Sequence, residues 1–211
     1  MKFIDLTHPL RDGQTSFPGD PALQIAPAAT IEKNRCNVSR IAMGSHQGTH
    51  LDALYHFVPD GKRLDQMPLE WFYGPAMLLR IPKKAGEEIT LANLKPFEAK
   101  LVPGARVIYE TGWHAHYGQS DYFTNFPSLT QEAAAYLAAR RIRLLGMDTP
   151  TPSRDYYEVH HLLQQKPAEI VIVESLANLD ALPENFLFIG FPLRFEGGDG
   201  SPIRAVAGVE G

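Results

Sequence analysis

The sequence contains a single cysteine, Cys36, and no apolar run long enough to cross a membrane. One thiol cannot form an intramolecular disulfide, which fits a reducing compartment, and we expect Cys36 to be buried and unreactive. A membrane-spanning helix needs about 18 consecutive apolar residues. At the N-terminus, Asp5 and His8 interrupt any apolar core of a signal peptide. We therefore expect a cytoplasmic protein without a membrane partner.

Positive charge is also scarce. The formal net charge is −4 and no basic run occurs, so nucleic-acid binding has no electrostatic support. A Gly-x-Ser-x-Gly nucleophile elbow is absent, which removes the usual signal of a serine hydrolase. The glycines at 197, 198 and 200 form a loop, but no helix with a Gly-Lys-Ser/Thr start follows, so a phosphate-binding loop is rejected. A small-molecule substrate is the expected partner.

The residues that are present predict one α/β domain over residues 1–211. Apolar residues make up 44% of the chain and charged residues 21%, which is the composition of a globular protein with a core. Strands are expected at 3–7, 37–43, 74–82, 106–111, 142–147, 170–174 and 186–191, and helices at 90–94, 132–141 and 157–163. The strand, helix and strand between 106 and 147 have the order of a parallel pair, which predicts a mixed sheet. A capping box formed by Ser128 and Gln131 is expected to open the helix at 132–141.

Three of the eight histidines lie between positions 46 and 56. His46, His50 and Asp52 carry the imidazole and carboxylate groups that bind zinc and similar divalent metals. In an extended strand His46 and His50 would lie about 13 Å apart at ~3.3 Å per residue, and in a helix Asp52 would point away from both. The chain must therefore bend between the two histidines, and Gly48 can supply the turn. A zincin protease is disfavoured, because Gln47 stands where its catalytic glutamate would be.

This stretch resembles the signature of the metal-dependent cyclase family, which includes bacterial kynurenine formamidases and isatin hydrolases. The family pattern is His-x-Gly-Thr-His-x-Asp-Ala-Pro-x-His, and the matching residues here are His46, Gly48, Thr49, His50, Asp52, Ala53 and His56. Leu54 stands where the family often has proline, which puts the backbone before His56 in question. The resemblance extends to the turn at 17–21, near the substrate entrance in the family, and to 111–113. It implies a sheet-rich β/β/α fold of the swivelling type.

Two further ligands are expected downstream of the motif. Glu174 follows a β-branched strand, where a carboxylate either faces solvent or serves a function, and it matches the family's Glu-x-Leu-x-Asn-Leu. The family also places a histidine before a Leu-Leu stretch, for which we favour His160 over His161. Adjacent helical residues diverge by about 100°, so both cannot easily face one metal, and a helix-surface position is the alternative for either. His114 and His116 are expected at the surface.

The number of candidate ligands predicts two ions, zinc or manganese, that share Asp52. A catalytic zinc usually takes about three protein ligands and keeps one position open. The candidates here are His46, His50, Asp52, His160 and Glu174. Two metal positions that share the two oxygens of Asp52 would use all of them. A single ion, with Glu174 in another role, is the alternative.

His56 is not needed as a ligand and is predicted to move protons between water and a leaving amine, a role that the resemblance also implies. The predicted activity is hydrolysis of a C–N bond in a formamide, and the resemblance makes N-formylkynurenine the first candidate substrate. An isatin-type lactam or a lactone is the second candidate, and a non-catalytic metal-binding protein is the third. Phe17, Trp113 and nearby tyrosines predict an aromatic pocket. A homodimer is the expected assembly.

Overall fold

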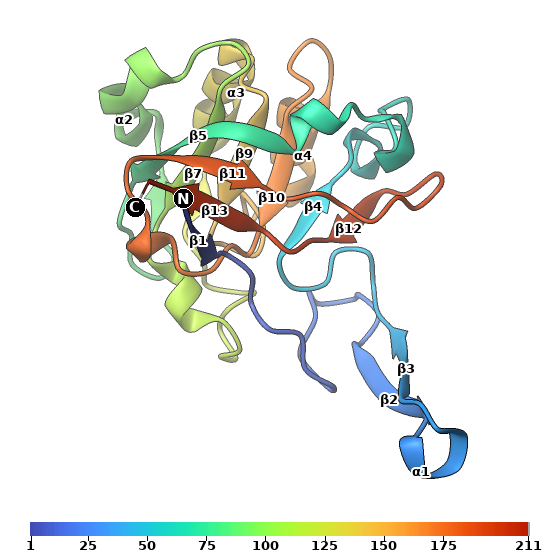
Figure 1. Cartoon of the computed structure of the whole chain (residues 1–211). Coiled ribbons are helices and arrows are strands. Elements are labelled where there is room, and N and C mark those ends of the chain that lie inside the picture. The colour runs from blue at the N-terminus through green and yellow to red at the C-terminus, as the bar shows by residue number, and fades with distance from the viewer. Residues whose placement is uncertain (211) are drawn as a thin grey trace.

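The computed structural model of the protein describes residues 1–210. Nine strands form one mixed sheet in the order β1-β13-β11-β5-β7-β9-β10-β4-β12 (Figure 1). Their bounds are Lys2–Asp5 for β1, His50–Asp52 for β4, Tyr73–Arg80 for β5, Arg106–Glu110 for β7, Leu144–Met147 for β9, Val171–Glu174 for β10, Asn185–Ile189 for β11, Gly200–Pro202 for β12 and Val206–Val209 for β13. Strands β5, β7, β9 and β10 run parallel, and the other neighbouring pairs are antiparallel. The predicted single-domain α/β fold with a mixed sheet is confirmed.

Alternating side chains give the sheet an apolar layer on each face. On β10, Val171 and Val173 pack into one layer and Ile172 into the other, as the period of two along a strand requires. The layer around Ile172 is covered by α2 (Leu91–Leu94), α3 (Gln131–Arg140) and α4 (Tyr156–Gln164). Loops and 3₁₀ turns cover the opposite layer. Each fully buried Val, Leu or Ile side chain contributes about 1.5–3 kcal/mol to the hydrophobic stabilisation of the sheet.

The predicted strand, helix and strand over 106–147 is confirmed, because β7 and β9 are parallel neighbours joined through α3. The helix begins at Gln131, one residue before the predicted start, and its predicted cap is wrong by two residues. Ser128 belongs to β8 (Ser128–Leu129), which pairs with β6 (Glu88–Ile89). Thr130 caps the helix instead, since its hydroxyl accepts the N–H of Ala133. No helix in residues 1–210 has both the length and the apolar character needed to cross a membrane.

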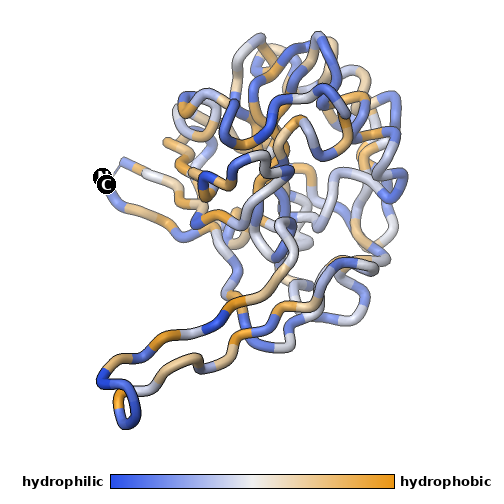
Figure 2. Tube along the Cα trace, turned by 90° about the vertical axis from the view of Figure 1, so that its right-hand side faces the viewer, coloured by the Kyte–Doolittle hydropathy of each residue, from blue (hydrophilic) through white to orange (hydrophobic). Residues whose placement is uncertain are grey.

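A two-stranded arm extends away from the body of the molecule (Figures 1 and 2). It consists of β2 (Gln24–Ala29) and β3 (Val38–Ala42), with the short helix α1 (Ile31–Asn34) between them. The strand expected at 37–43 is β3, whereas β2 was not predicted, because Pro27 interrupts its sequence pattern. Cys36 lies in the arm and is exposed, so the expectation of a buried thiol is wrong. The residues before and after Cys36 in the sequence are exposed as well.

Candidate metal centre

The bend that the sequence requires between His46 and His50 is present. Gly48 has a φ of +65°, and a Cβ atom there would lie 2.7 Å from a methyl group of Leu10, so both the conformation and the space favour glycine. The chain then enters β4, which lies between β10 and β12. The antiparallel register of β4 and β10 places His50 directly opposite Glu174. Residues that are far apart in sequence thereby meet at one end of two strands.

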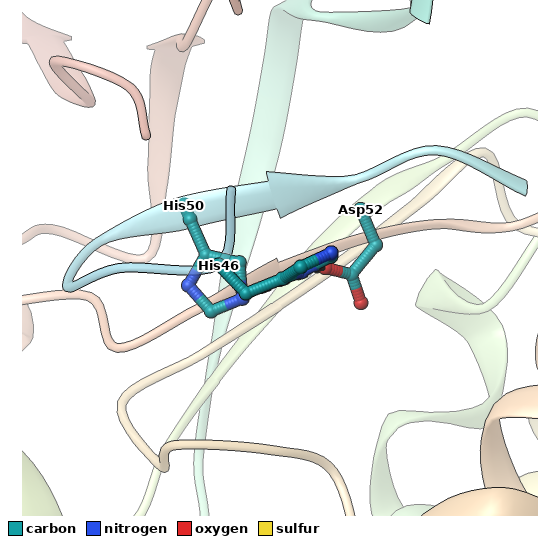
Figure 3. Close-up of side chains that lie close together, drawn as sticks. All are labelled: His46, His50 and Asp52. Atoms are coloured by element: carbon teal, nitrogen blue, oxygen red, sulfur yellow. Dashed lines mark hydrogen bonds and ion pairs between the residues drawn. The ribbon is translucent and has the colours of Figure 1, made fainter. Parts of the chain in front are cut away.

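The first candidate metal position lies among His46, His50 and Asp52. His46 Nδ1 is 2.8 Å and His50 Nε2 is 3.4 Å from Asp52 Oδ1. Figure 3 shows the two rings and the carboxylate gathered on the same side of β4. His50 Nε2 also lies 3.2 Å from Glu174 Oε2. Nitrogen and oxygen atoms at these separations could all contact one ion of the zinc type.

The second candidate position lies among Asp52, His160 and Glu174, whose ligand atoms also fall within 4.8 Å of one another. His160 Nε2 is 3.4 Å from Asp52 Oδ2 and 3.2 Å from Glu174 Oε1. The structure thus brings His160 to the cluster. His161, the next residue on α4, lines a different cavity. The two oxygens of Asp52 point to the two positions, as a shared carboxylate would.

The centre is buried and rich in carboxylate charge. Asp52 is fully buried, and its Oδ2 atom has no hydrogen-bond partner in the described part of the chain. Burial would lower the pKa of His50, but Asp52 and Glu174 raise that pKa to about 10. The same two carboxylates outweigh the burial of His160 and raise its pKa to about 9. Two buried carboxylates are costly unless positive charge lies beside them, and divalent cations can supply that charge in place of protons on the histidines. The residues fit a metal centre.

Each of the three histidines has its second ring nitrogen occupied. His50 Nδ1 is 2.8 Å from the carbonyl oxygen of Gly48, and His160 Nδ1 is 2.6 Å from that of Tyr156. A carbonyl only accepts, so both rings donate there and leave Nε2 free for a metal. His46 has the opposite arrangement, with Nδ1 facing Asp52 and Nε2 lying 3.2 Å from Asp199 Oδ2. Such contacts fix the ring orientation of metal-binding histidines.

His56 lies beside the cluster but forms no hydrogen bond with Asp52 or Glu174. His56 ends a 3₁₀ turn, Leu54–His56, and its backbone N–H donates to the backbone carbonyl of Ala53. Its ring stacks on that of His46 with 3.8 Å between centroids. Burial lowers the pKa of His56 to about 4, and the positive charge of His46 adds to this effect. The His56 ring is therefore uncharged at neutral pH, and one of its nitrogens carries a free lone pair.

The replacement of proline by Leu54 leaves this turn in a regular form. Ala53 is extended, with φ −75° and ψ 158°, which is the conformation that a residue before proline also adopts. Leu54 is the first residue of the turn, a position that suits proline, and it is buried. The backbone before His56 thus keeps a proline-compatible course, with a leucine side chain packed in the core.

The cluster opens into a cavity of about 340 Å³. Its polar floor contains His50, His56, His160 and Glu174. Its remaining aromatic lining consists of Phe17, Phe57, Tyr117, Phe123 and Tyr156. Phe17 packs edge-on against Phe123 and Tyr156, with ring centroids 5.9 and 6.1 Å apart. Of these, Phe57 and Phe123 were not singled out from the sequence, because isolated aromatic residues in loops carry no local signal of a pocket.

Trp113 is placed differently from the expectation, and His114 and His116 make contacts that the sequence does not reveal. Trp113 does not line the cavity; it is buried against Tyr122 and Phe126, and its ring N–H donates to the carbonyl of Tyr122. His114 and His116 are partly exposed and lie outside the candidate metal positions. His114 Nδ1 is 3.4 Å from the buried carboxylate of Asp148, and His116 stacks on Trp113. These side chains hold a loop near the cavity and contribute no ligand to the metal cluster.

The fold and the cluster of histidines and carboxylates agree with the protein family that the sequence matches. A family model described as putative cyclase matches residues 4–154. The chain belongs to this cyclase family and is a metal-dependent hydrolase. The resemblance seen in the His46–His56 motif is therefore confirmed.

Particular relatives span nearly the whole chain. Kynurenine formamidase of Bacillus cytotoxicus is 30% identical over 210 residues, which cover 97% of this chain and 96% of the relative. Among solved structures, isatin hydrolase A from Ralstonia solanacearum has a TM-score of 0.86 and 26% identity, covering 99% of this chain and 92% of its own. Isatin hydrolase A from Labrenzia aggregata, bound to benzyl benzoate, has a TM-score of 0.85 and 28% identity, covering 98% and 93%.

Proposed function

We propose that this enzyme hydrolyses the C–N bond of an aryl formamide of the N-formylkynurenine type. One observation carries the proposal: a buried set of three histidines and two carboxylates opens into a small cavity with aromatic walls. Relatives named kynurenine formamidase over nearly the full length support the substrate class. A cavity of this size and lining suits a small aromatic molecule.

We propose two divalent cations, zinc or manganese, in this centre. His46, His50 and Asp52 would hold the first, and Asp52, His160 and Glu174 the second. The chemistry that such cations supply is activation of water and polarisation of a substrate carbonyl. The unpartnered Oδ2 of Asp52 supports the sharing of this carboxylate between two positions. This oxygen is buried and lies 3.4 Å from His160 Nε2, and no other group in residues 1–210 donates a hydrogen bond to it.

His56 is proposed as the group that moves protons during the reaction. It lines the cavity, is neutral at neutral pH, and forms no hydrogen bond with the carboxylates. Its ring can therefore take a proton from the attacking water and return it to the departing amine nitrogen. The stacking on His46 holds the ring next to the cluster. A site that only stored metal would have no use for such a base.

Hydrolysis of a cyclic amide or a lactone is the second candidate. The structures most relevant to this alternative are the isatin hydrolases, which share the fold over nearly the whole chain. A flat bicyclic lactam would also contact the aromatic side chains that line the cavity.

The test combines metal analysis with a substrate panel. Protein treated with a chelator should lose hydrolysis, and added Zn²⁺ or Mn²⁺ should restore it. The values of kcat/KM should then be measured for N-formylkynurenine, formylanilide, an aliphatic formamide, isatin and an aromatic lactone. We expect the aryl formamides to exceed the aliphatic one by at least about tenfold, because burying an aromatic ring contributes about 1.5–3 kcal/mol and its stacking on aromatic side chains adds to that. Higher values for isatin would establish the second candidate, and full activity without metal would exclude the proposed mechanism.

The expected homodimer and cytoplasmic location stay predictions. Sedimentation velocity of the purified protein tests the first, and fractionation of the source cells tests the second.

A further inference from the structure

The glycine-rich loop at 197–200 has no part in the function proposed so far. In the structure it lies against the metal centre. The carbonyl of Asp199 accepts the N–H of Ala53, and Gly200 pairs with Asp52 where β12 joins β4. Figure 1 shows β12 beside β4 at this edge of the sheet. The loop is thus fixed to the strand that carries two of the proposed ligands.

Asp199 directs a carboxylate oxygen at His46. Its Oδ2 atom lies 3.2 Å from His46 Nε2 and accepts a hydrogen bond of 3.2 Å from the Ser45 hydroxyl. The other ring nitrogen of His46 faces Asp52. A carboxylate is an acceptor, so Asp199 favours the form of the ring in which Nε2 carries the proton and the Nδ1 lone pair is free.

Gly200 provides the space for the same ring. A Cβ atom at this position would lie 2.4 Å from His46 Cε1 and 2.8 Å from Nε2. No real Cβ approaches a ring this closely, so any larger residue would displace the imidazole. Asp199 therefore favours one tautomer of His46, and Gly200 leaves the space in which its ring lies.

The contrast with the other two histidines shows why this contact matters. The rings of His50 and His160 are oriented by backbone carbonyls two and four residues away in sequence. His46 precedes β4 and lies before the bend at Gly48. Its only polar contact apart from Asp52 in residues 1–210 comes from a loop 153 residues further along the chain.

We infer that Asp199 is a positioning residue that orients His46 for the first metal position, with Gly200 as the surface on which the ring packs. The inference rests on the proposed metal centre. A third metal position is the competing interpretation, because ligand atoms of His46, His56 and Asp199 also lie within 4.8 Å of one another. That arrangement would require His46 to ligate through both nitrogens, one of which would then lack its proton.

The test measures metal affinity in Asp199→Ala and Asp199→Asn by isothermal titration of Zn²⁺ into metal-free protein. We expect the affinity of one site to fall by about 10–100-fold in Asp199→Ala, as when other outer partners of metal-binding histidines are removed. Asp199→Asn should show a smaller loss of Zn²⁺ affinity, since its amide oxygen still accepts a hydrogen bond. Asp65→Asn is the matched control, because Asp65 accepts the N–H of Gly197 and holds the same loop without a hydrogen bond to His46. It should bind metal like the wild type.

A second measurement reads the ring itself. In ¹⁵N NMR of the zinc-loaded wild type, His46 should show a protonated Nε2 and a metal-bound Nδ1, and Asp199→Ala should weaken or exchange-broaden the Nε2 proton signal. Unchanged affinity and an unchanged His46 signal in Asp199→Ala would overturn the inference. Three ions in the wild type and two in the variant would make Asp199 a ligand and also overturn it. Wild-type protein that binds no metal would instead refute the proposed function.

Discussion

Two fully buried aspartates, Asp52 and Asp148, lie on either side of β10 and meet different surroundings. Asp148 follows β9 and accepts hydrogen bonds from the N–H groups of Thr111 and Gly112, at 3.1 and 2.8 Å, and from the Thr111 hydroxyl at 2.8 Å. One imidazole, that of His114, lies farther away, with Nδ1 3.4 Å from Asp148 Oδ2. Asp52 has the imidazoles of His46, His50 and His160 around it, and its Oδ2 lacks any hydrogen bond in residues 1–210. Both side chains are shielded from water to the same degree.

The difference separates a structural carboxylate from a metal-binding one. Backbone N–H groups are fixed donors that cannot leave, so Asp148 is satisfied by the fold and ties the loop at 111–114 to the end of β9. Imidazoles can lose their protons, which leaves room for a cation between ring and carboxylate. Burial alone therefore does not identify a functional aspartate; the kind of donor around it does.

Asp52→Asn should give the largest effect. The amide offers one oxygen, so it cannot bridge two positions, and both metals should be weakened or lost. Metal-assisted catalysis supplies several kcal/mol, so kcat/KM should fall by more than about 10³-fold. Native mass spectrometry gives the metal content and a substrate assay gives the rate. A variant that retains two tightly bound ions would remove Asp52 from its proposed role.

Glu174→Ala should separate the two metal positions. It removes a ligand atom 3.2 Å from His160 Nε2, so about one ion per chain should be lost while the first remains. Titration of metal-free protein, followed by mass spectrometry under native conditions, measures this directly. If the wild type reaches full activity with one ion per chain, the two-metal proposal fails and Glu174 must have another role.

His56→Ala should change the rate and leave the metals in place. General acid–base catalysis contributes about 10²–10⁴-fold, so kcat should decrease by that factor. Elemental analysis of the purified variant provides the control. Loss of metal in this variant would show that His56 is a ligand.

Asp148→Asn should affect stability and leave the metals in place. The amide keeps one acceptor oxygen but turns its NH₂ donor toward a backbone N–H donor, at a cost of about 2–3 kcal/mol to the free energy of unfolding. For a chain of this length the melting temperature should fall by about 5–10 °C. Calorimetry and metal titration of the same sample test both statements. Reduced metal content in the folded variant would break the distinction between the two aspartates.

Local sequence determined the parts of this protein that depend on neighbouring residues. Short runs of apolar, partly β-branched residues predicted β7, β9 and β10, and alanines with charged ends predicted α3, because both signals depend on residues only a few positions apart. The motif from His46 to His56 predicted a bend at Gly48, since neither a straight strand nor a helix could bring His46, His50 and Asp52 together. The cap of the helix is Thr130 and not Ser128, because Ser128 belongs to β8, whose pairing with β6 local patterns do not reveal.

Tertiary structure decided which distant groups complete the site. Glu174 meets His50 only through the register of β4 and β10, and His160 is turned toward the cluster by the way α4 packs on the sheet. Asp199 had no local signal at all, because its contact with His46 spans 153 residues. The same is true of Asp148, whose donors come from the loop that follows β7. A residue's neighbours in the chain fix its backbone conformation, but the partners of a buried charge are fixed by which strands lie side by side.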